Sequence, residues 1–258
     1  MSTIIFTIKD GVAYLQLNRT EKFNSFNREM SLELQRALDD CENNEDVRCI
    51  VLSGAGKAFC AGQDLAEATA PDGPELERIV AEHYNPIITK IRQIEKPIIA
   101  AVNGVAAGAG ANIALACDIV VASTNASFIQ AFSKIGLIPD SGGTFFLPRL
   151  IGLQRASALM FTAEKIAADD ALQMGMVYKV FADESFLSET QKLATSLAQM
   201  PTKGIGLTKR LLNESFNNNL SQQLEREKQM QVKAGQTHDF KEGVAAFLEK
   251  RNPVFKGK

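Results

Sequence analysis

The chain has 258 residues, and 28 Lys and Arg against 30 Asp and Glu give it a formal net charge of −2. Its length and its 45% hydrophobic content suit one sizeable globular core, whereas the absence of a basic block argues against nucleic acid as a partner. No apolar run reaches the roughly 20 residues of a membrane-spanning helix, and no basic leader opens the sequence. We therefore expect a cytoplasmic protein without a membrane partner.

The N-terminal half alternates strand patterns with helical ones. Two strand-like runs flank Asp10-Gly11, a dipeptide typical of a tight hairpin turn. Small polar residues at 69–73 predict a surface loop. The expected strands are Ile4–Lys9, Val12–Leu17, Cys49–Ser53, Ile98–Val102 and Ile119–Ala122, and the expected helices are Asn27–Cys41, Glu75–Ile94 and Ala109–Ala116. This β–α–β order predicts an α/β layered fold.

Beyond about Gln154 the pattern becomes mostly helical. Helices are expected at Ala156–Thr162, Ala167–Met174, Glu184–Met200, Lys203–Asn217 and Leu220–Thr237, with one strand at Val177–Phe181. Several faces in the last part are apolar, formed by Leu207, Leu211, Leu212 and Phe216 and then by Val244, Phe247 and Leu248. We divide the chain into a core at residues 1–200 and a helical region at 201–258, which we expect to cover a site or to form an oligomer.

The cysteine and histidine content argues against a metal site. The four cysteines form no Cys-x-x-Cys pair, which favours reduced thiols over disulfides or zinc; they are Cys41, Cys49, Cys60 and Cys117. Two histidines are too few for a multi-histidine metal centre. We expect neither a metal nor a resident cofactor.

The segment between Lys96 and Ala163 is rich in glycine and holds only two carboxylates, Asp118 and Asp140. Isolated acids in an apolar, glycine-rich stretch are where a buried site is expected. Asp118 stands at a helix-to-strand junction, which favours a structural acid that binds local backbone N–H groups. Asp140 lies in a turn, where it could cap a helix or serve in catalysis.

Two glycine-rich turns, Phe59–Leu65 and Gly104–Asn112, each offer backbone N–H groups after a strand. Small residues let a ligand approach the main chain, and the helix that begins in the second turn favours negative charge at its start. The second turn only partly matches a dinucleotide-binding fingerprint, because Ile113 takes the third glycine position. We therefore expect no nicotinamide cofactor.

These segments resemble the crotonase (enoyl-CoA hydratase/isomerase) superfamily over essentially the whole chain. The motifs that carry the resemblance are Leu17–Arg19, Asn24–Phe26, Gly54–Leu65, Lys96–Gly110 and Gly136–Thr144. Within the superfamily, Ala131–Thr144 and Glu242–Phe255 are most similar to the 1,2-epoxyphenylacetyl-CoA isomerases of bacterial phenylacetate catabolism. The resemblance implies a spiral core of repeated ββα units with a helical C-terminal extension, an acyl-CoA substrate, and trimers that often pair into hexamers.

The resemblance also implies which residues contact the substrate. Two backbone N–H groups, of Gln63 and Ala109, would hold the thioester oxygen and stabilise its enolate. The adenine would lie along residues 61–65, and Lys22 would lie near the CoA phosphates unless it is an ordinary surface lysine. The full set of predicted substrate or CoA contacts is Lys22, Ala61, Gln63, Asp64, Leu65, Gly110, Asn112 and Phe132.

Asn112 and Phe132 distinguish this chain from the hydratases of the superfamily. They occupy the positions of the two glutamates with which hydratases exchange protons, and neither side chain can exchange a proton. Asp140 instead stands where hydratases commonly have glycine and where dienoyl-CoA isomerases have an aspartate. We therefore expect Asp140 to shuttle a proton in an isomerisation, either of 3-enoyl-CoA to 2-enoyl-CoA or, as the favoured reaction, of a ring epoxide carried on acetyl-CoA.

Three alternatives remain open at this level. Asp140 could attack an aromatic ring as a nucleophile, as in hydrolytic dehalogenation. The protein could instead act as a hydratase, or it could bind CoA only as a partner subunit of a hydratase. Four phenylalanines could line an acyl pocket or belong to the ordinary core: Phe128, Phe132, Phe145 and Phe146.

Overall fold

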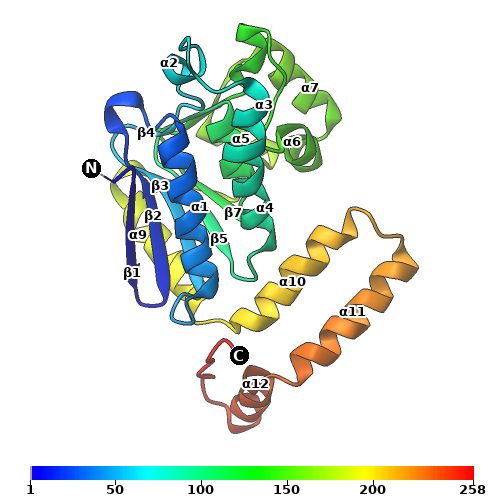
Figure 1. Cartoon of the computed structure of the whole chain (residues 1–258). Coiled ribbons are helices and arrows are strands. Elements are labelled where there is room, and N and C mark those ends of the chain that lie inside the picture. The colour runs from blue at the N-terminus through cyan, green and yellow to red at the C-terminus, as the bar shows by residue number, and fades with distance from the viewer. Residues whose placement is uncertain (1) are drawn as a thin grey trace.

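The computed structural model describes residues 2–258, and its strands form two sheets (Figure 1). The six-stranded sheet runs in the order β1-β2-β3-β5-β7-β10, with bounds Ile4–Lys9, Val12–Leu17, Cys49–Gly54, Ile98–Val102, Ile119–Ser123 and Lys179–Phe181. The four-stranded sheet runs β4-β6-β8-β9, with bounds Ala58–Cys60, Val105–Ala107, Ser127–Ile129 and Lys165–Ala167. β1 and β2 form the predicted antiparallel hairpin, and from β2 to β10 the neighbours in the larger sheet are parallel.

The helices agree with the predicted ranges to within a few residues at most of their ends. Their bounds are α1 Arg28–Asn43, α2 Leu65–Ala68, α3 Leu76–Arg78, α4 Asn85–Gln93, α5 Ala109–Ala116, α6 Gly143–Ile151, α7 Leu153–Thr162, α8 Ala168–Met174, α9 Asp183–Ala198, α10 Thr202–Ser215, α11 Leu220–Gly235 and α12 His238–Glu249, with 3₁₀ helices η1 at Thr20–Lys22 and η3 at Ala131–Ile135. The predicted set lacks α2, α6 and α12, and the strand predicted at Val177–Phe181 is shorter in the structure.

The predicted repetition of ββα units is confirmed. Each of β3, β5 and β7 is a long strand of the six-stranded sheet, and each is followed directly by a three-residue strand of the second sheet. Helix α2 comes after the first pair, α5 after the second and η3 after the third. Because β4, β6 and β8 are parallel neighbours, the turns that follow them lie along one edge of their sheet.

Both faces of the six-stranded sheet are covered. On β5, the side chains of Ile98, Ala100 and Val102 pack in the main core with α1, α4 and α5. The intervening Ile99 and Ala101 pack in a second cluster, with α9 on the opposite face. All five side chains are buried, which explains why this strand is continuously apolar rather than alternating.

The predicted helix Glu75–Ile94 is wrong in one respect, because it is interrupted. The chain forms α3, then one π-helical turn, η2 (Ile79–Tyr84), and then α4. Pro86 accounts for the change, since proline has no backbone N–H to donate and its ring crowds the carbonyl one turn earlier. In the π-helical turn the Asn85 N–H reaches a more distant carbonyl than it would in an α-helix, and Tyr84 becomes buried.

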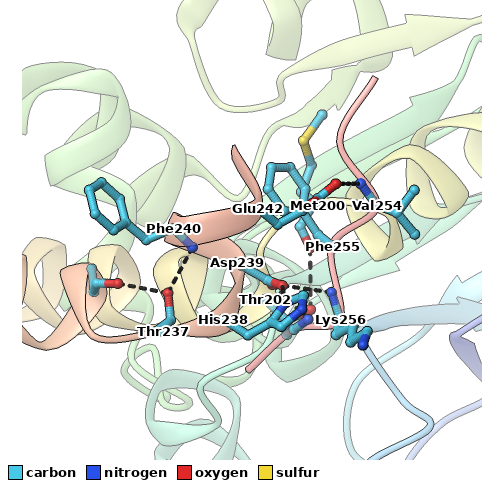
Figure 2. A network of polar contacts seen from close by, with 12 residues as sticks. Met200, Thr202, Thr237, His238, Asp239, Phe240, Glu242, Val254, Phe255 and Lys256 are labelled. Atoms are coloured by element: carbon cyan, nitrogen blue, oxygen red, sulfur yellow. Dashed lines mark hydrogen bonds and ion pairs between the residues drawn. The ribbon is translucent and has the colours of Figure 1, made fainter. Parts of the chain in front are cut away.

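Helices α11 and α12 extend beyond the body of the molecule, and the chain end folds back beside α12 (Figure 1). The Asp239 carboxylate holds this end, because it accepts hydrogen bonds from the N–H groups of Lys256 and Gly257, both at 2.7 Å (Figure 2). Arg48, which precedes β3, donates to the Phe255 carbonyl at 2.8 Å. The last residues therefore tie α12 to the central sheet.

Asp118 joins α10 to the core. Its carboxylate pairs with Arg92 of α4 at 3.0 Å and with Lys209 of α10 at 2.7 Å. It also accepts a hydrogen bond from the Ile98 N–H at 2.9 Å. The Lys209 side chain is only 6% exposed, so its charge depends on this carboxylate for compensation. The arrangement supports the structural role predicted for Asp118.

We predict that Asp118→Asn lowers the free energy of unfolding by about 3 kcal/mol or more, because two cations lose the carboxylate that they share. Urea denaturation at neutral pH measures the change. Glu189→Gln is the matched control, since Glu189 pairs with the exposed Lys192 and its loss should cost less than about 1 kcal/mol. Equal losses in the two variants would contradict the prediction.

Candidate active site

The two glycine-rich turns meet at one edge of the four-stranded sheet, where β4 and β6 are parallel neighbours. Gly62 has a φ of +96°, and a Cβ there would lie 3.0 Å from the Ala107 carbonyl oxygen and 3.6 Å from the Ala109 nitrogen. A Cβ on Gly110 would lie 2.5 Å from the Cys60 carbonyl oxygen. Glycine at both positions is therefore what permits this contact between main chains.

The predicted oxyanion donors lie in these turns with free N–H groups. Within residues 2–258, neither the Gln63 N–H nor the Ala109 N–H donates a hydrogen bond. Their neighbours are engaged, because the N–H groups of Asp64 and Gly108 donate to backbone carbonyls at 2.8 and 2.9 Å. Ala109 is also the first residue of α5, where the helix dipole favours negative charge. The two groups are thus available to a developing oxyanion.

Asp140 lies in a turn of uncommon backbone conformation. Ser141 and Gly142 adopt left-handed φ values of 51° and 73°, which costs a serine roughly 1 kcal/mol or more. The Asp140 carbonyl accepts hydrogen bonds from the Gly143 N–H at 2.9 Å and from the Asn112 side chain at 2.8 Å. The Ser141 hydroxyl donates to the Asp140 carboxylate at 2.9 Å. These bonds fix both the backbone and the carboxylate of Asp140.

The surroundings of the Asp140 carboxyl favour its neutral form. Burial raises the pKa of Asp140 above the usual value of an aspartate, and the hydrogen bond from Ser141 offsets this effect only in part. A carboxylate with a raised pKa is a stronger base, so it is better matched to the removal of a proton from a carbon acid. Asp140 is therefore chemically suited to the predicted proton shuttle.

Two of the predicted substrate contacts, Asn112 and Gly110, have a supporting role in the structure. Asn112 is fully buried, and its side chain donates to the Asp140 carbonyl and accepts from the Gln130 amide, each at 2.8 Å. A Cβ on Gly143 would lie 2.3 Å from the Asn112 amide nitrogen, so glycine at 143 belongs to the same arrangement. Gly110 is buried against β4. Both residues therefore belong to the framework of the site, and their contact with the substrate stays a prediction.

The four phenylalanines do not line a single pocket. Phe128 is buried within the main core, in agreement with the core alternative. The ring of Phe132 lies 3.8 Å from the position that a Cβ on Gly108 would take, which is beside the start of α5. Phe145 and Phe146 lie on α6, where they pack against each other, and Phe145 also packs against α10. Phe132 is thus the ring that the structure places beside a predicted oxyanion donor.

The predicted CoA contacts at the rim fall into two groups. Lys22, Ala61 and Leu65 are exposed, and the Ala61 N–H donates at 3.0 Å to the carbonyl of the residue that follows Lys22. Asp64 is engaged, because its carboxylate pairs with Arg19 at 2.8 Å and caps the start of α2. Burial acts to raise the pKa of Asp64, but the Arg19 guanidinium and the cap lower it below its usual value. Asp64 is therefore a structural carboxylate, whereas the other three side chains are accessible.

Sequence reasoning missed three residues that support the site: Gln130, Arg19 and Ser141. Gln130 and Arg19 hold their partners across 18 and 45 residues of chain, so no local pattern could have revealed them. Ser141 directly follows Asp140, and the run Asp-Ser-Gly-Gly could have indicated a left-handed turn.

A cysteine thiol also lies at the site. The Cys60 thiol lies beside the first turn, but burial raises its pKa to about 12, so it is no nucleophile at neutral pH. Among residues 2–258, no three His, Cys, Asp or Glu side chains gather in a way that could hold a metal ion. No helix in the same range combines the length and the apolar character that crossing a membrane requires.

Comparisons with known proteins extend over nearly the whole chain. A sequence model of the family described as enoyl-CoA hydratase/isomerase matches residues 7–258. The 1,2-epoxyphenylacetyl-CoA isomerase of Escherichia coli is 46% identical over 261 residues, which covers 100% of both chains. A probable enoyl-CoA hydratase of Rhodobacter capsulatus is 43% identical over 256 residues, which covers 99% of this chain and 98% of that one. A crystal structure of the enoyl-CoA hydratase/isomerase type from Mycobacterium abscessus superposes with a TM-score of 0.94 at 38% identity, covering 99% of this chain and 100% of that one.

We predict that Asp140→Asn makes the protein more stable than the wild type at neutral pH. Because burial raises the Asp140 pKa, folding favours the protonated acid; this stabilisation is present below the usual pKa and is lost as the pH rises through the raised one. Urea denaturation between about pH 4 and about pH 8 should show the advantage of the variant growing with pH.

Asp64→Asn is the matched control for this pH series. The pKa of Asp64 is lowered and its carboxylate pairs with Arg19, so the same change should reduce stability at neutral pH. An Asp140→Asn variant that is less stable than the wild type at neutral pH would contradict the prediction.

Proposed function

The chain belongs to the enoyl-CoA hydratase/isomerase family, and within that family we propose that it is an acyl-CoA isomerase. The observation that carries the proposal is the pairing of one half-buried carboxylate of raised pKa, Asp140, with two free backbone N–H groups, those of Gln63 and Ala109. The two positions at which hydratases have their glutamates hold Asn112 and Phe132. A single carboxylate can take up and return one proton, which is the requirement of an isomerisation.

In the proposed mechanism, Asp140 removes a proton from a carbon of the acyl group whose electron pair can be delocalised into the thioester. The electron pair left behind moves toward the thioester, whose oxygen becomes an enolate held by the N–H groups of Gln63 and Ala109. One such donor lowers a barrier by roughly 2.7–4 kcal/mol. The protonated Asp140 then returns the proton to a different carbon, so that the product is an isomer of the substrate and the CoA thioester stays intact.

We propose 2-(1,2-epoxy-1,2-dihydrophenyl)acetyl-CoA as the substrate, within phenylacetate degradation. The support is the 46% identity to the Escherichia coli protein named 1,2-epoxyphenylacetyl-CoA isomerase, together with the Phe132 ring beside the start of α5. The same proton shuttle would also convert a 3-enoyl-CoA into a 2-enoyl-CoA. No further cofactor is needed, since coenzyme A is part of the substrate, and we propose a cytoplasmic location.

Hydration and nucleophilic substitution are the competing reactions. The Rhodobacter capsulatus relative is named a probable enoyl-CoA hydratase, but the buried amide of Asn112 is engaged in hydrogen bonds and cannot activate water. A panel of acyl-CoAs analysed by mass spectrometry separates the alternatives. Added water would indicate a hydratase, a trapped ester at Asp140 a dehalogenase-like nucleophile, and inactivity without a partner protein a CoA-binding subunit of a hydratase.

We predict that Asp140→Asn lowers turnover by about 10²-fold or more and leaves acyl-CoA binding intact, because the variant keeps the shape of the side chain and loses the base. Steady-state kinetics and binding calorimetry measure the two effects. Exchange of solvent deuterium into substrate or product should occur in the wild type and vanish in the variant.

Asn112→Ala is the comparison variant for this experiment. It removes a support of the Asp140 backbone but no titratable group, so it should cost much less turnover than Asp140→Asn. Near-normal turnover and exchange in Asp140→Asn would show that another acid moves the proton.

We also propose that the protein assembles as a homotrimer or a hexamer. Leu207 is already buried by its own chain, but Leu212, Phe247 and Leu248 on α10 and α12 are 61%, 82% and 74% exposed. Exposed apolar surface of this kind is costly in water and normally marks an interface. Light scattering should therefore give a mass of three or six chains, whereas a stable monomer at micromolar concentration would contradict the assembly.

A further inference from the structure

Tyr84 is a buried polar side chain that the proposed mechanism does not use. It is fully buried at the end of the π-helical turn η2, and its hydroxyl donates to the side-chain carbonyl of Gln63 at 2.7 Å. A buried tyrosine hydroxyl normally has a hydrogen-bond partner. Here that partner is the residue whose backbone N–H is a proposed oxyanion donor.

The main chain is fixed on both sides of this donor. Phe26 donates its N–H to the Gly62 carbonyl at 2.7 Å and accepts from the Asp64 N–H at 2.8 Å. The ring of Tyr84 packs edge-to-face against the ring of Phe26, with centroids 5.9 Å apart. Tyr84 therefore contacts both the side chain of Gln63 and the residue that holds the peptides next to it.

The surroundings of Tyr84 keep its hydroxyl protonated. Burial, together with the nearby Cys60, Asp140 and Glu67, raises the pKa of Tyr84 well above its ordinary value. The hydroxyl therefore stays protonated and can donate its hydrogen bond at neutral pH.

The π-helical turn explains how Tyr84 reaches this position. Ile79 and Tyr84 stand at its two ends, and both are buried. An α-helix of 3.6 residues per turn would direct residues with this spacing to different faces, whereas the wider π-helical turn brings them closer to one face. The interruption of the α-helix before Pro86 therefore helps to place Tyr84 beside Gln63.

We propose that Tyr84 is a positioning residue: through the Gln63 side chain, its hydroxyl holds the Gln63 peptide so that the backbone N–H is aligned with the thioester oxygen. The proposal rests on the proposed function, because it takes Gln63 as an oxyanion donor. It also gives the Gln63 side chain a role separate from that of its backbone.

Tyr84→Phe is the direct test, because it removes the hydroxyl and keeps the ring against Phe26. With a 3-enoyl-CoA as substrate, kcat should fall roughly three- to tenfold, as expected for one lost hydrogen bond, and KM should change by less than about twofold. The infrared carbonyl band of a bound, carbonyl-labelled 2-enoyl-CoA should shift less from its free position than in the wild type. Tyr14→Phe on β2 is the matched control and should behave as the wild type.

Gln63→Met provides a second variant, since it removes the amide that accepts the hydrogen bond and keeps the backbone N–H. If Tyr84 acts through Gln63, the double variant should lose no more activity than the more affected single variant. Additive losses, or an unchanged kcat and carbonyl band in Tyr84→Phe, would overturn the proposal. If Tyr84→Phe does not fold, an unchanged kcat and band in Gln63→Met would overturn it equally.

The carbonyl band also separates this proposal from the proposed function. It requires only that an acyl-CoA binds, so it does not depend on which reaction follows. A wild-type band that does not shift on binding would contradict the oxyanion site itself. A shifted wild-type band that Tyr84→Phe and Gln63→Met both leave unchanged would contradict only the role of Tyr84.

Discussion

The contact between the main chain after β4 and the start of α5 is the constraint on which the rest of the site depends. Backbone approaches backbone there because Gly62 and Gly110 have no side chains. The free N–H groups of Gln63 and Ala109 are consequently carried by a strand end and a helix start rather than by flexible side chains. Donors held in this way need little reorganisation as charge develops. The side chain at 63 is then free for another task, which fits its hydrogen bond with Tyr84.

The turn that carries Asp140 is unfavourable for the stability of the fold, and hydrogen bonds from neighbouring residues compensate for this cost. A carboxylate that is partly removed from water and a serine in a left-handed conformation are both unfavourable. The Asp140 backbone is nevertheless fixed by the Gly143 N–H and by Asn112, which Gln130 in turn holds. Asn112 thus supports the turn in which we propose that Asp140 acts. Local strain that is over-determined by surrounding contacts is typical of functional sites.

A helix or strand can be predicted from the sequence only where it is long enough to show its hydrophobic pattern. The strand Ile98–Val102 and the helix Ala109–Ala116 were predictable because each is long enough to show its pattern. The three-residue strand at 58–60 is too short to do so. The functional roles of Asp140 and of the donor at Gln63 came from the family resemblance, whereas the engagement of Asp64 by Arg19 needed the fold. The contact of Arg19 with Asp64 joins residues 45 positions apart, so it produces no local sequence pattern.

Helix α10 is bound to the core more closely than α12 is. α10 belongs to the core, because Lys209 compensates Asp118 and because a Cβ on Gly206 would lie 2.4 Å from the Glu95 carbonyl oxygen. It also brings Phe216 against Phe145 of α6, which follows the Asp140 turn. In contrast, α12 is held to the sheet mainly through the last residues of the chain and keeps a broad apolar face exposed. A change in α10 can thus reach the turn of Asp140 within one chain, whereas the exposed apolar face of α12 suits the contact between chains that we propose.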